Sequence, residues 1–423
     1  MLTAFYFKEK NMAVFRPFRA YRPSVKNQNL IPALPYDVLT DDEAREAVKG
    51  NSLSFLHIDK AEIDLPLGTD PYCKEVYEKA RENLLTLEQN GDLIQDASPC
   101  LYIYRQIMNG RAQTGIVGCA SIDDYTNNVI KKHEYTLAKK EQDRINHVDA
   151  CNANTSPIFL TYRKNEDIEQ IISKWISLHE PVYDFDFDGV RQTVWVINDV
   201  AVSNRIQTIF TGVDSFYIAD GHHRCASAVR VGEMRRKEKG VYTGEEEFNF
   251  FLAVAFNDED LKIMDYNRVV KDLNGYSLDE FISAVSKSFE VKPLARKCHP
   301  KEKHTFCMCC DKKWYLIKAK DGSFDESDPV ARLDVSILQN NLLAPILNIT
   351  DPKNDDRIDF IGGIRGLDEL ERRTETDMKI AFAMYPTTVD DLMSIADAGK
   401  IMPPKSTWFE PKLLSGIFIH HLS

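Results

Sequence analysis

Five consecutive residues, Asp220 to Arg224, combine the side chain types that proteins use to hold phosphate. His222 and His223 can each donate a hydrogen bond to a phosphoryl oxygen or move a proton, and Arg224 can offer a planar fork of donors to an oxyanion. Asp220 can accept a backbone N–H at a helix N-terminus or coordinate Mg²⁺. Gly221 lets a ligand approach the backbone closely. This order of residue types predicts a phosphate-binding site.

The residues on either side of this motif predict the elements that position it. Phe216–Ala219 is an apolar run typical of a strand, and Cys225–Val229 is typical of the first turns of a helix. A strand, a tight turn and a helix in succession point backbone N–H groups and the positive end of the helix dipole at one place. A capped helix with satisfied histidines is the alternative, but so many polar residues in succession favour binding.

A second polar stretch, residues 131–154, also carries chemistry-bearing side chains. They are Lys131, Lys132, His133, Glu134, Glu141, Asp143, Arg144, His147 and Asp149. Placed between strands, the stretch fits a mobile loop that supplies a general base and brings cations such as Lys132 and Arg144 to phosphates. It fits a solvated, salt-bridged helix face equally well.

Two further segments combine charged residues with rigid proline turns. Near the N-terminus, Arg16–Arg19 and Leu34–Val38 place arginine and Asp37 beside prolines. Near the C-terminus, Met402–Lys412 contains two lysines, Lys405 and Lys412, and two hydroxyl side chains. This proline-rich segment fits the lining of a ligand pocket and an ordinary surface segment about equally well.

Composition limits the classes of partner. The 423 residues carry a formal net charge of −12, which argues against a nucleic-acid backbone as the main partner. The sequence has no apolar run of about 18 residues, so we expect no membrane span. No secretory signal is visible, and we expect a cytoplasmic protein in which residues 1–11 form an extension outside the fold. Gly362–Gly366 is glycine-rich but matches neither a Walker loop nor G-x-G-x-x-G.

The nine cysteines are scattered and odd in number, unlike the framework of a secreted protein. Residues Cys298 to Cys310, with two histidines among them, resemble a metal site on paper. The spacing Cys-x-Cys-Cys, however, lacks the paired Cys-x-x-Cys of structural zinc sites. We therefore expect incidental thiols on a strand in preference to a metal site.

Hydrophobic periodicity predicts a chain in which helices and strands interleave irregularly. Helices are expected over residues 70–93, 166–178, 278–289 and 331–345. Strands are expected over residues 101–104, 114–118, 158–162, 193–197, 250–256, 314–317 and 380–385. The predicted fold class is therefore mixed α/β (α+β), with a core over residues 12–240 and a C-terminal α/β part over residues 241–423 packed on it.

Several segments taken together resemble one protein family. They are Arg16-Pro17-Phe18-Arg19-Ala20, Leu34-Pro35-Tyr36-Asp37-Val38, Ser54-Phe55-Leu56-His57, Lys132-His133-Glu134, the Asp220–Arg224 motif and Met402-Pro403-Pro404-Lys405-Ser406-Thr407. These segments look like the family labelled domain of unknown function 1015 (DUF1015), and the resemblance covers nearly the whole chain from Met12 onward.

The Asp-Gly-His-His-Arg motif also resembles the phosphate-binding motif of the ParB/sulfiredoxin superfamily, to which free serine kinases belong. That resemblance implies a ParB/sulfiredoxin-like core elaborated with additional strands and helices. It further implies that Asp220, His222, His223 and Arg224 bind the transferring phosphate and its metal. Those kinases use an upstream carboxylate as base, and here Glu134 and Asp37 are the candidates, with His223 a further candidate for proton transfer.

Two departures narrow the resemblance. Sulfiredoxins carry a catalytic cysteine before the His-Arg of the motif, where this chain has His222, so sulfiredoxin chemistry is disfavoured. The acidic charge and the lack of a helix-turn-helix signal disfavour a ParB-like DNA-binding role.

The leading prediction is a phosphotransferase that acts on a small hydroxylated metabolite, with free L-serine the best candidate. The donor is ATP, ADP or pyrophosphate, Mg²⁺ binds at Asp220, and the oligomeric state is not predicted. The alternatives are a non-catalytic nucleotide- or phosphate-binding regulator and a metal-dependent phosphohydrolase.

Overall fold

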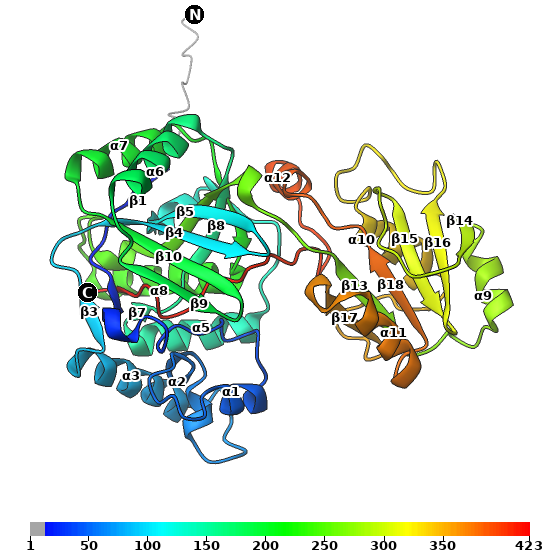
Figure 1. The fold of residues 1–423 in the computed structure, drawn as a ribbon, viewed down its shortest axis with the longest axis horizontal. Coiled ribbons are helices and arrows are strands. Elements are labelled where there is room, and N and C mark those ends of the chain that lie inside the picture. Colours follow the sequence, from blue (N-terminus) through cyan, green and yellow to red (C-terminus); the bar gives the residue numbers. More distant parts are fainter. Residues whose placement is uncertain (1–12) are drawn as a thin grey trace, which may run out of the picture. The chain divides into compact units, whose positions relative to one another are not determined.

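The computed structural model describes residues 13–423, so the predicted extension at residues 1–11 lies outside the described residues. The fold is mixed α/β, as the sequence predicts (Figure 1). The chain divides into two compact units. The first unit contains the chain up to Leu261 together with the C-terminal segment Pro411–Ser423, and the second unit is Lys262–Glu410.

A nine-stranded mixed sheet forms the centre of the described part of the first unit. Its strands run in the order β6 (Ile130–Lys131), β11 (Phe216–Asp220), β8 (Ile158–Tyr162), β12 (Phe250–Asn257), β5 (Arg111–Ser121), β4 (Leu101–Met108), β10 (Val190–Ile197) and β9 (Tyr183–Phe187), and β1 (Phe15–Arg16) also pairs with β5. The pairs β11–β6 and β12–β8 are parallel, whereas the other neighbours are antiparallel.

The boundary between the two units lies further along the chain than the boundary that the sequence predicts between residues 240 and 241, and strand β12 explains this difference. All eight residues of β12 are buried, and it pairs with β5 on one edge and β8 on the other. A continuous apolar run buried on both faces is typical of a central strand. The first unit therefore extends to Leu261, and the predicted C-terminal part begins too early.

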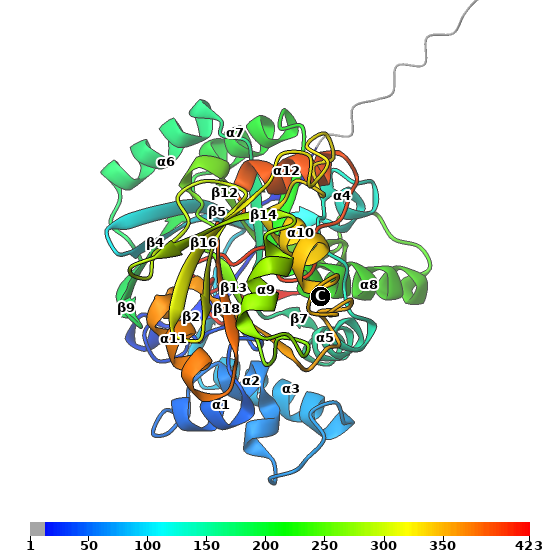
Figure 2. The ribbon, with the colours of Figure 1, turned by 90° about the vertical axis from the view of Figure 1, so that its right-hand side faces the viewer.

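Helices pack around the sheet of the first unit, some of them on other helices instead of on the sheet itself. They are α1 (Asp41–Ala47), α2 (Leu56–Asp59), α3 (Lys74–Gln89), α4 (Ile122–Thr126), α5 (Ala138–Cys151), α6 (Glu166–Leu178), α7 (Val200–Thr211) and α8 (His222–Lys239). Helix α3, for example, packs on α5. Helices α6 and α7 lie side by side in both ribbon views (Figures 1 and 2). The helix predicted over residues 166–178 is confirmed as α6, which begins after the Asn165 cap and buries Ile168, Ile172 and Trp175.

The second unit is built on a six-stranded antiparallel sheet. Its order is β14 (Phe289–Leu294), β16 (Lys313–Ala319), β15 (Thr305–Cys310), β18 (Ile380–Met384), β13 (Tyr266–Val270) and β17 (Ile358–Gly362), with α9 (Leu278–Val285), α10 (Asp334–Leu338), α11 (Gly366–Thr376) and α12 (Val389–Asp397). Two helices predicted in this unit are shorter than expected, as is α3 in the first unit, which spans Lys74–Gln89 instead of residues 70–93. Helix α9 ends at Val285 because Phe289 already belongs to β14. Helix α10 continues into a π-helix over Gln339–Leu343.

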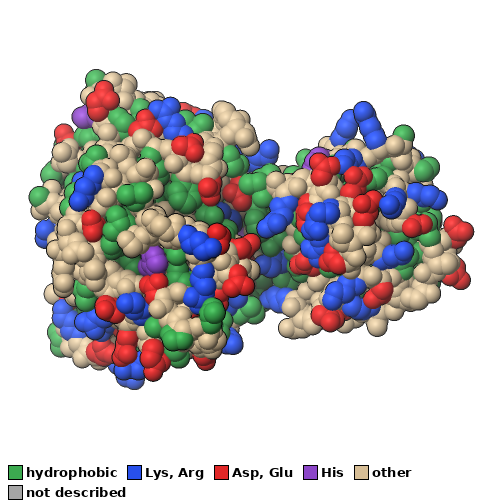
Figure 3. All heavy atoms as spheres, turned by 60° about the horizontal axis from the view of Figure 1, so that its bottom comes forward, with side chains coloured by type: hydrophobic (Ala, Val, Ile, Leu, Met, Phe, Trp, Pro, Cys, Tyr) green, Lys and Arg blue, Asp and Glu red, His purple; other side chains and the backbone are tan. Residues whose placement is uncertain are grey.

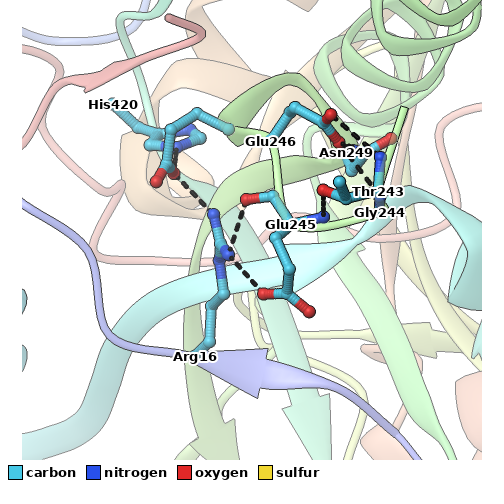
Figure 4. A network of polar contacts seen from close by, with 8 residues as sticks. Arg16, Thr243, Gly244, Glu245, Glu246, Asn249 and His420 are labelled. Carbon is cyan, nitrogen blue, oxygen red and sulfur yellow. Dashed lines mark hydrogen bonds and ion pairs between the residues drawn. The ribbon is translucent and has the colours of Figure 1, made fainter. Parts of the chain in front are cut away.

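The C-terminal segment returns to the first unit through a polar network (Figure 4). Arg16 on β1 donates to Glu247 Oε2 at 2.7 Å, and His420 Nε2 lies 2.8 Å from the same oxygen. His420 belongs to β19 (His420–His421), which pairs with β7 (Ala153–Asn154). Arg16 thus helps to hold the two ends of this unit together, a structural role for an arginine that the sequence singled out beside Pro17.

On the face drawn in Figure 3, acidic and basic side chains lie interspersed. Within residues 13–423, no helix combines the length and apolarity needed to cross a membrane.

Candidate functional site

The predicted strand, turn and helix around the motif are confirmed. Strand β11 ends at Asp220, Gly221 has φ of +90°, and α8 begins at His222. A Cβ atom at position 221 would lie 3.0–3.1 Å from three atoms of the Arg224 guanidinium group. Glycine is therefore needed here for two reasons: the left-handed backbone and the close approach of Arg224. The sequence predicted a close approach at Gly221, and in the structure the approaching group is a side chain of the same motif.

Asp220 is held by two contacts. Its Oδ1 accepts the Gly221 N–H at 2.9 Å, and its Oδ2 lies 3.1 Å from the Lys412 ammonium. Burial alone would raise the pKa of this carboxyl, but Lys412, Arg224 and the Gly221 N–H together hold the pKa well below its usual range. Asp220 is thus a carboxylate with a cation already beside it. Gly221, the N-cap residue of α8, makes no side-chain cap hydrogen bond, and the first-turn N–H groups of a helix have no intrahelical acceptor.

His222 is the most deeply buried polar side chain of the motif, with 6% of it exposed. Its Nδ1 lies 3.8 Å from Glu134 Oε2, while its Nε2 is buried and has no hydrogen-bond partner among residues 13–423. The His133 ring packs edge-on against it at a centroid distance of 4.4 Å. Burial first, and then the neighbouring His133, lowers the pKa of His222 well below its ordinary value. A buried imidazole nitrogen without a protein partner is a candidate hydrogen-bonding group for a ligand.

His223 anchors the segment that precedes α5. Its Nε2 accepts the Leu137 N–H at 3.0 Å, which places the proton of a neutral ring on Nδ1. At the other end of that segment, Glu134 reaches His222. The chain between these two contacts, residues 134–137, is therefore held across the start of α8.

Arg224 joins the motif to two other parts of the first unit. Its Nη1 donates to Ser156 Oγ and to the Pro157 carbonyl, both at 2.7 Å. Ser415 Oγ in turn donates to Ser156 Oγ at 3.0 Å. The C-terminal segment, which also supplies Lys412, is thus built into the site at two points.

A narrow polar pocket adjoins the motif on the side of Arg224. It is lined by Tyr36, Asp59, Arg144, His147, Val148, Asn154, Thr155, Ser156, Ile158, Arg224 and Ser227. Its volume of about 20 Å³ is the space of one water-sized group. Asp59 Oδ1 accepts from the Thr155 hydroxyl at 3.1 Å, whereas its buried Oδ2 has no partner in the described residues. The Arg144 guanidinium lies 4.0 Å from the centre of the Tyr36 ring.

The structure separates the residues that the sequence grouped. Glu134 and the motif residues surround the start of α8, and Arg144 lies in the adjoining pocket. Lys132 is exposed, with its Nζ 4.7 Å from the centre of the Tyr125 ring, and the charge of Lys132 contributes to the lowered pKa of His222. Asp37 is exposed beside Tyr36. Lys405 belongs to the second unit, where its Nζ lies 5.6 Å from the centre of the Tyr266 ring.

The stretch 131–154 fits neither of its two interpretations entirely. Residues 132–137 lie outside helix and strand, whereas α5 begins at Ala138. Asp143, Arg144 and His147 are buried on that helix instead of solvated. Sequence reasoning missed Asp59 and Ser156, and it included Lys412 only as a member of the proline-rich segment. Of these, only Lys412 had a signal, because it ends the proline-rich segment at 402–412.

No group of three or more His, Cys, Asp or Glu side chains within residues 13–423 is arranged to hold a metal ion. Mg²⁺ binds proteins through one or two carboxylates and takes its other ligands from phosphates and water, whereas in this structure both Asp220 oxygens already accept, one from the Gly221 N–H and one from Lys412. The thiols of Cys307, Cys309 and Cys310 are buried on β15, and all three cysteines are free.

One protein family and several solved structures are similar to this chain. The model of the family described as protein of unknown function (DUF1015) matches residues 15–336. Among solved structures, a free serine kinase in complex with AMP is 14% identical, with a TM-score of 0.37, over 72% of this chain and 91% of that one. A conserved hypothetical protein from Pyrococcus furiosus is 14% identical, with a TM-score of 0.36, over 72% and 94%.

SbnI with a C-terminal truncation from Staphylococcus aureus is 9% identical, with a TM-score of 0.37, over 71% of this chain and 85% of that one. Such low TM-scores carry no argument about activity. No curated protein matches the sequence.

Proposed function

This chain belongs to the family described as protein of unknown function (DUF1015), and we propose that it transfers a phosphoryl group from a nucleotide or pyrophosphate to a small hydroxylated metabolite. The observation that carries this proposal is the start of α8. There, the buried His222 Nε2, which has no hydrogen-bond partner within residues 13–423, lies with the Arg224 guanidinium and the Lys412 ammonium near the N-terminus of a helix whose N-cap residue, Gly221, makes no side-chain cap hydrogen bond.

The donor phosphates bind at this helix N-terminus. First-turn N–H groups and the helix dipole favour negative charge, and Arg224 and Lys412 add two fixed cations. His222, which burial keeps neutral, donates from Nε2 to a phosphoryl oxygen when its proton lies on that nitrogen. Catalysis is then positioning and neutralisation of charge in the transition state, the two contributions that phosphoryl transfer mostly requires.

Glu134 is the better candidate for the general base. Its carboxylate is 39% exposed and 3.8 Å from His222 Nδ1, so it can face both the phosphate site and an entering hydroxyl. A carboxylate that accepts the proton of the attacking hydroxyl is the usual base of small-molecule kinases. Asp37 stays the second candidate, because its neighbour Tyr36 lines the pocket beside Arg224.

Free L-serine is the acceptor that the motif resemblance favours, and the narrow pocket is compatible with it. An ammonium group has about the size of the space beside Asp59 and would satisfy the open Oδ2 of that carboxylate. Arg144 lines the same pocket, and its positive charge, which also pairs with Asp143, would attract the carboxylate of the acceptor. The pocket therefore supports binding of the ammonium group of the acceptor beside Asp59.

Mg²⁺ bound at Asp220 would neutralise charge on the donor phosphates. For Asp220 to accept it, the Lys412 ammonium has to move from Oδ2 toward the phosphates.

The test is incubation of the full chain with L-serine, Mg²⁺ and each of ATP, ADP and pyrophosphate, followed by ³¹P NMR for O-phosphoserine. Phosphoserine with at least one donor, lost in Asp220→Ala, is the expected result. No phosphoserine with any donor contradicts the serine assignment. Saturable donor binding without turnover would instead favour a regulator, and release of phosphate without an acceptor would favour a phosphohydrolase. With 3-hydroxypropionate, which lacks the ammonium, we expect the acceptor KM to rise at least tenfold.

A further inference from the structure

Strand β15 of the second unit carries three thiols that the proposed activity does not use. Cys307 and Cys309 are two residues apart and therefore lie on one face of the sheet, where both belong to the apolar core that includes Leu370 of α11. Cys310 points to the opposite face. All three cysteines are buried and free. Packing of this strand does not require sulfur, since valine or alanine fills similar space.

A fourth thiol reaches this face from a segment without regular structure. Cys298 lies between the end of β14 and the start of β15, and its Sγ is 3.1 Å from Cys307 Sγ. Cys298 is partly exposed, whereas Cys307 is fully buried. The two sulfur atoms are thus in contact, one on a partly exposed residue and the other on a buried residue.

Contacts on both sides of Cys298 hold it over β15. Lys297 Nζ donates to Glu371 Oε2 at 2.6 Å and also contacts Asp368, both on α11. The Trp314 indole donates to the other oxygen of Glu371 at 2.8 Å, which orients that carboxylate. His299 Nδ1, on the far side of Cys298, lies 3.9 Å from Asp265 Oδ2. Both chain neighbours of Cys298 therefore keep it near Cys307, while Cys298 itself lies in a segment without regular structure.

We infer that Cys298 and Cys307 form a reversible thiol-oxidation site, in which a peroxide converts the pair into a disulfide. In the first step the Cys298 sulfur attacks hydrogen peroxide, forming a sulfenic acid and releasing one water molecule. In the second step the Cys307 sulfur displaces the sulfenic hydroxyl, which leaves as a second water molecule, and the S–S bond forms. Each cysteine loses one hydrogen, and one peroxide is reduced to two waters. A dithiol such as dithiothreitol reverses the bond by exchange.

The geometry favours this pair over the other thiols. To reach a bonded distance of about 2.05 Å, the two sulfurs have to close by roughly 1 Å, and the irregular segment at Cys298 can supply that movement while β15 stays in its sheet. Cys309 Sγ instead contacts the Thr374 hydroxyl at 3.7 Å. Burial raises the pKa of the Cys307 thiol, which agrees with Cys298 as the thiol that reacts first.

The experiment is peptide mapping of the full chain after treatment with hydrogen peroxide and blocking of remaining thiols with N-ethylmaleimide. Trypsin cleaves after Lys297, Lys301 and Lys303, so Cys298 and Cys307 fall on different peptides. We expect a cross-linked pair lighter than the two peptides by two hydrogens, with fragment ions that assign the bond to Cys307 and not to its neighbours. Dithiothreitol should abolish it.

Matched variants separate this pair from general oxidation. Cys309→Ser should keep the cross-link, whereas Cys298→Ser should lose it. Cys307→Ser should leave a sulfenic acid at Cys298 that dimedone captures at least tenfold more strongly than in the wild type. Cys73, also partly exposed but in the first unit, serves as the control thiol and should form no cross-link. A bond from Cys298 to Cys309 or Cys310, or oxidation of Cys298 without any cross-link in the wild type, overturns the inference. The wild-type map decides even where a variant fails to fold.

Discussion

Replacement of Lys412 by methionine tests the centre of the proposed site. The change removes the ammonium 3.1 Å from Asp220 Oδ2 and keeps a long unbranched side chain. Two unit charges at this separation attract by ~5 kcal/mol at an effective dielectric constant of about 20 and by ~1 kcal/mol in water. The Asp220 and Lys412 side chains are 32% and 15% exposed, so the pair lies between these limits. After the cost of desolvation, we expect Lys412→Met to lose ~1–3 kcal/mol of unfolding free energy.

The pH dependence of this loss has a definite sign. Asp220 has a lowered pKa in the folded protein, so its ionised form stabilises the fold above its unfolded pKa of about 3.9, and this contribution is lost as the pH falls through the folded pKa. The deficit of Lys412→Met relative to the wild type should therefore be complete above about pH 5 and shrink below about pH 4. Urea unfolding of both proteins at pH 7 and at acidic pH measures it.

The same variant should also lose activity, because Lys412 is one of the cations expected on the transferring phosphoryl group. Loss of one such preorganised charge lowers kcat by ~10²–10³. The matched control is Lys400→Met, which breaks the 2.8 Å pair of Lys400 with Asp328 in the second unit. That partly exposed pair should contribute no more than ~1 kcal/mol and leave phosphoserine formation unchanged. If Lys412→Met matched the control in both assays, Lys412 would be an ordinary counter-ion and the site argument would fail.

Three further predictions concern the same site. Gly221→Ala should lower the free energy of unfolding, measured in urea, by ~1–3 kcal/mol, since its Cβ would meet Arg224. Gly189→Ala, with φ of +74° but open space around it, should lower this free energy by less. An equal loss in both variants would refute a contribution from the contact with Arg224. Burial lowers the pKa of His133 to about 4, so the unfolded chain binds its proton first and stability falls as the pH drops from about 6.5 to 4. His133→Gln should flatten that part of the stability curve by at most ~3 kcal/mol, and an unchanged slope would contradict the burial argument. Glu134→Gln should lower kcat by ~10²–10⁴ with an unchanged donor KM, and full activity would exclude it as base.

The strand, turn and helix of the motif were predictable because the signals are local. An apolar run, a glycine with positive φ and a helix start all lie within a few residues of Asp220. The same holds for α6, where the Asn165 cap and one apolar face mark the helix from Glu166 to Leu178. At the end of α9 the local signals overlap, because an amphipathic helix and a half-buried strand share apolar residues at short range. The apolar pattern therefore extended the predicted helix over residues that precede β14.

The contribution of Lys412 was not predictable in this way. It lies 192 residues after Asp220 and reaches it because the segment 411–423 returns to the first unit. Ser415 exchanges backbone hydrogen bonds with Ala33, and a Cβ atom at Gly416 would meet the Phe55 ring at 2.5 Å. These contacts depend on how distant parts of the chain pack, and nothing within a window of a few residues records them. The sequence therefore favoured Lys405, which stands in the same proline-rich segment but belongs to the other unit.

Helix α5 shows why charge patterning left two interpretations open. Its charged residues have the pattern of a solvated face, yet Asp143 accepts from the Tyr77 hydroxyl of α3 at 2.9 Å, and Asp149 pairs with Arg235 of α8 at 2.6 Å. A charge can be buried where neighbouring helices offer it partners, and those partners lie 66 and 86 residues away in the chain. A run of mixed charges thus indicates polar contacts without saying whether water or protein makes them. Only the packing of α5 between α3 and α8 places Arg144 in a pocket beside Arg224, and so turns a surface-like pattern into part of the candidate site.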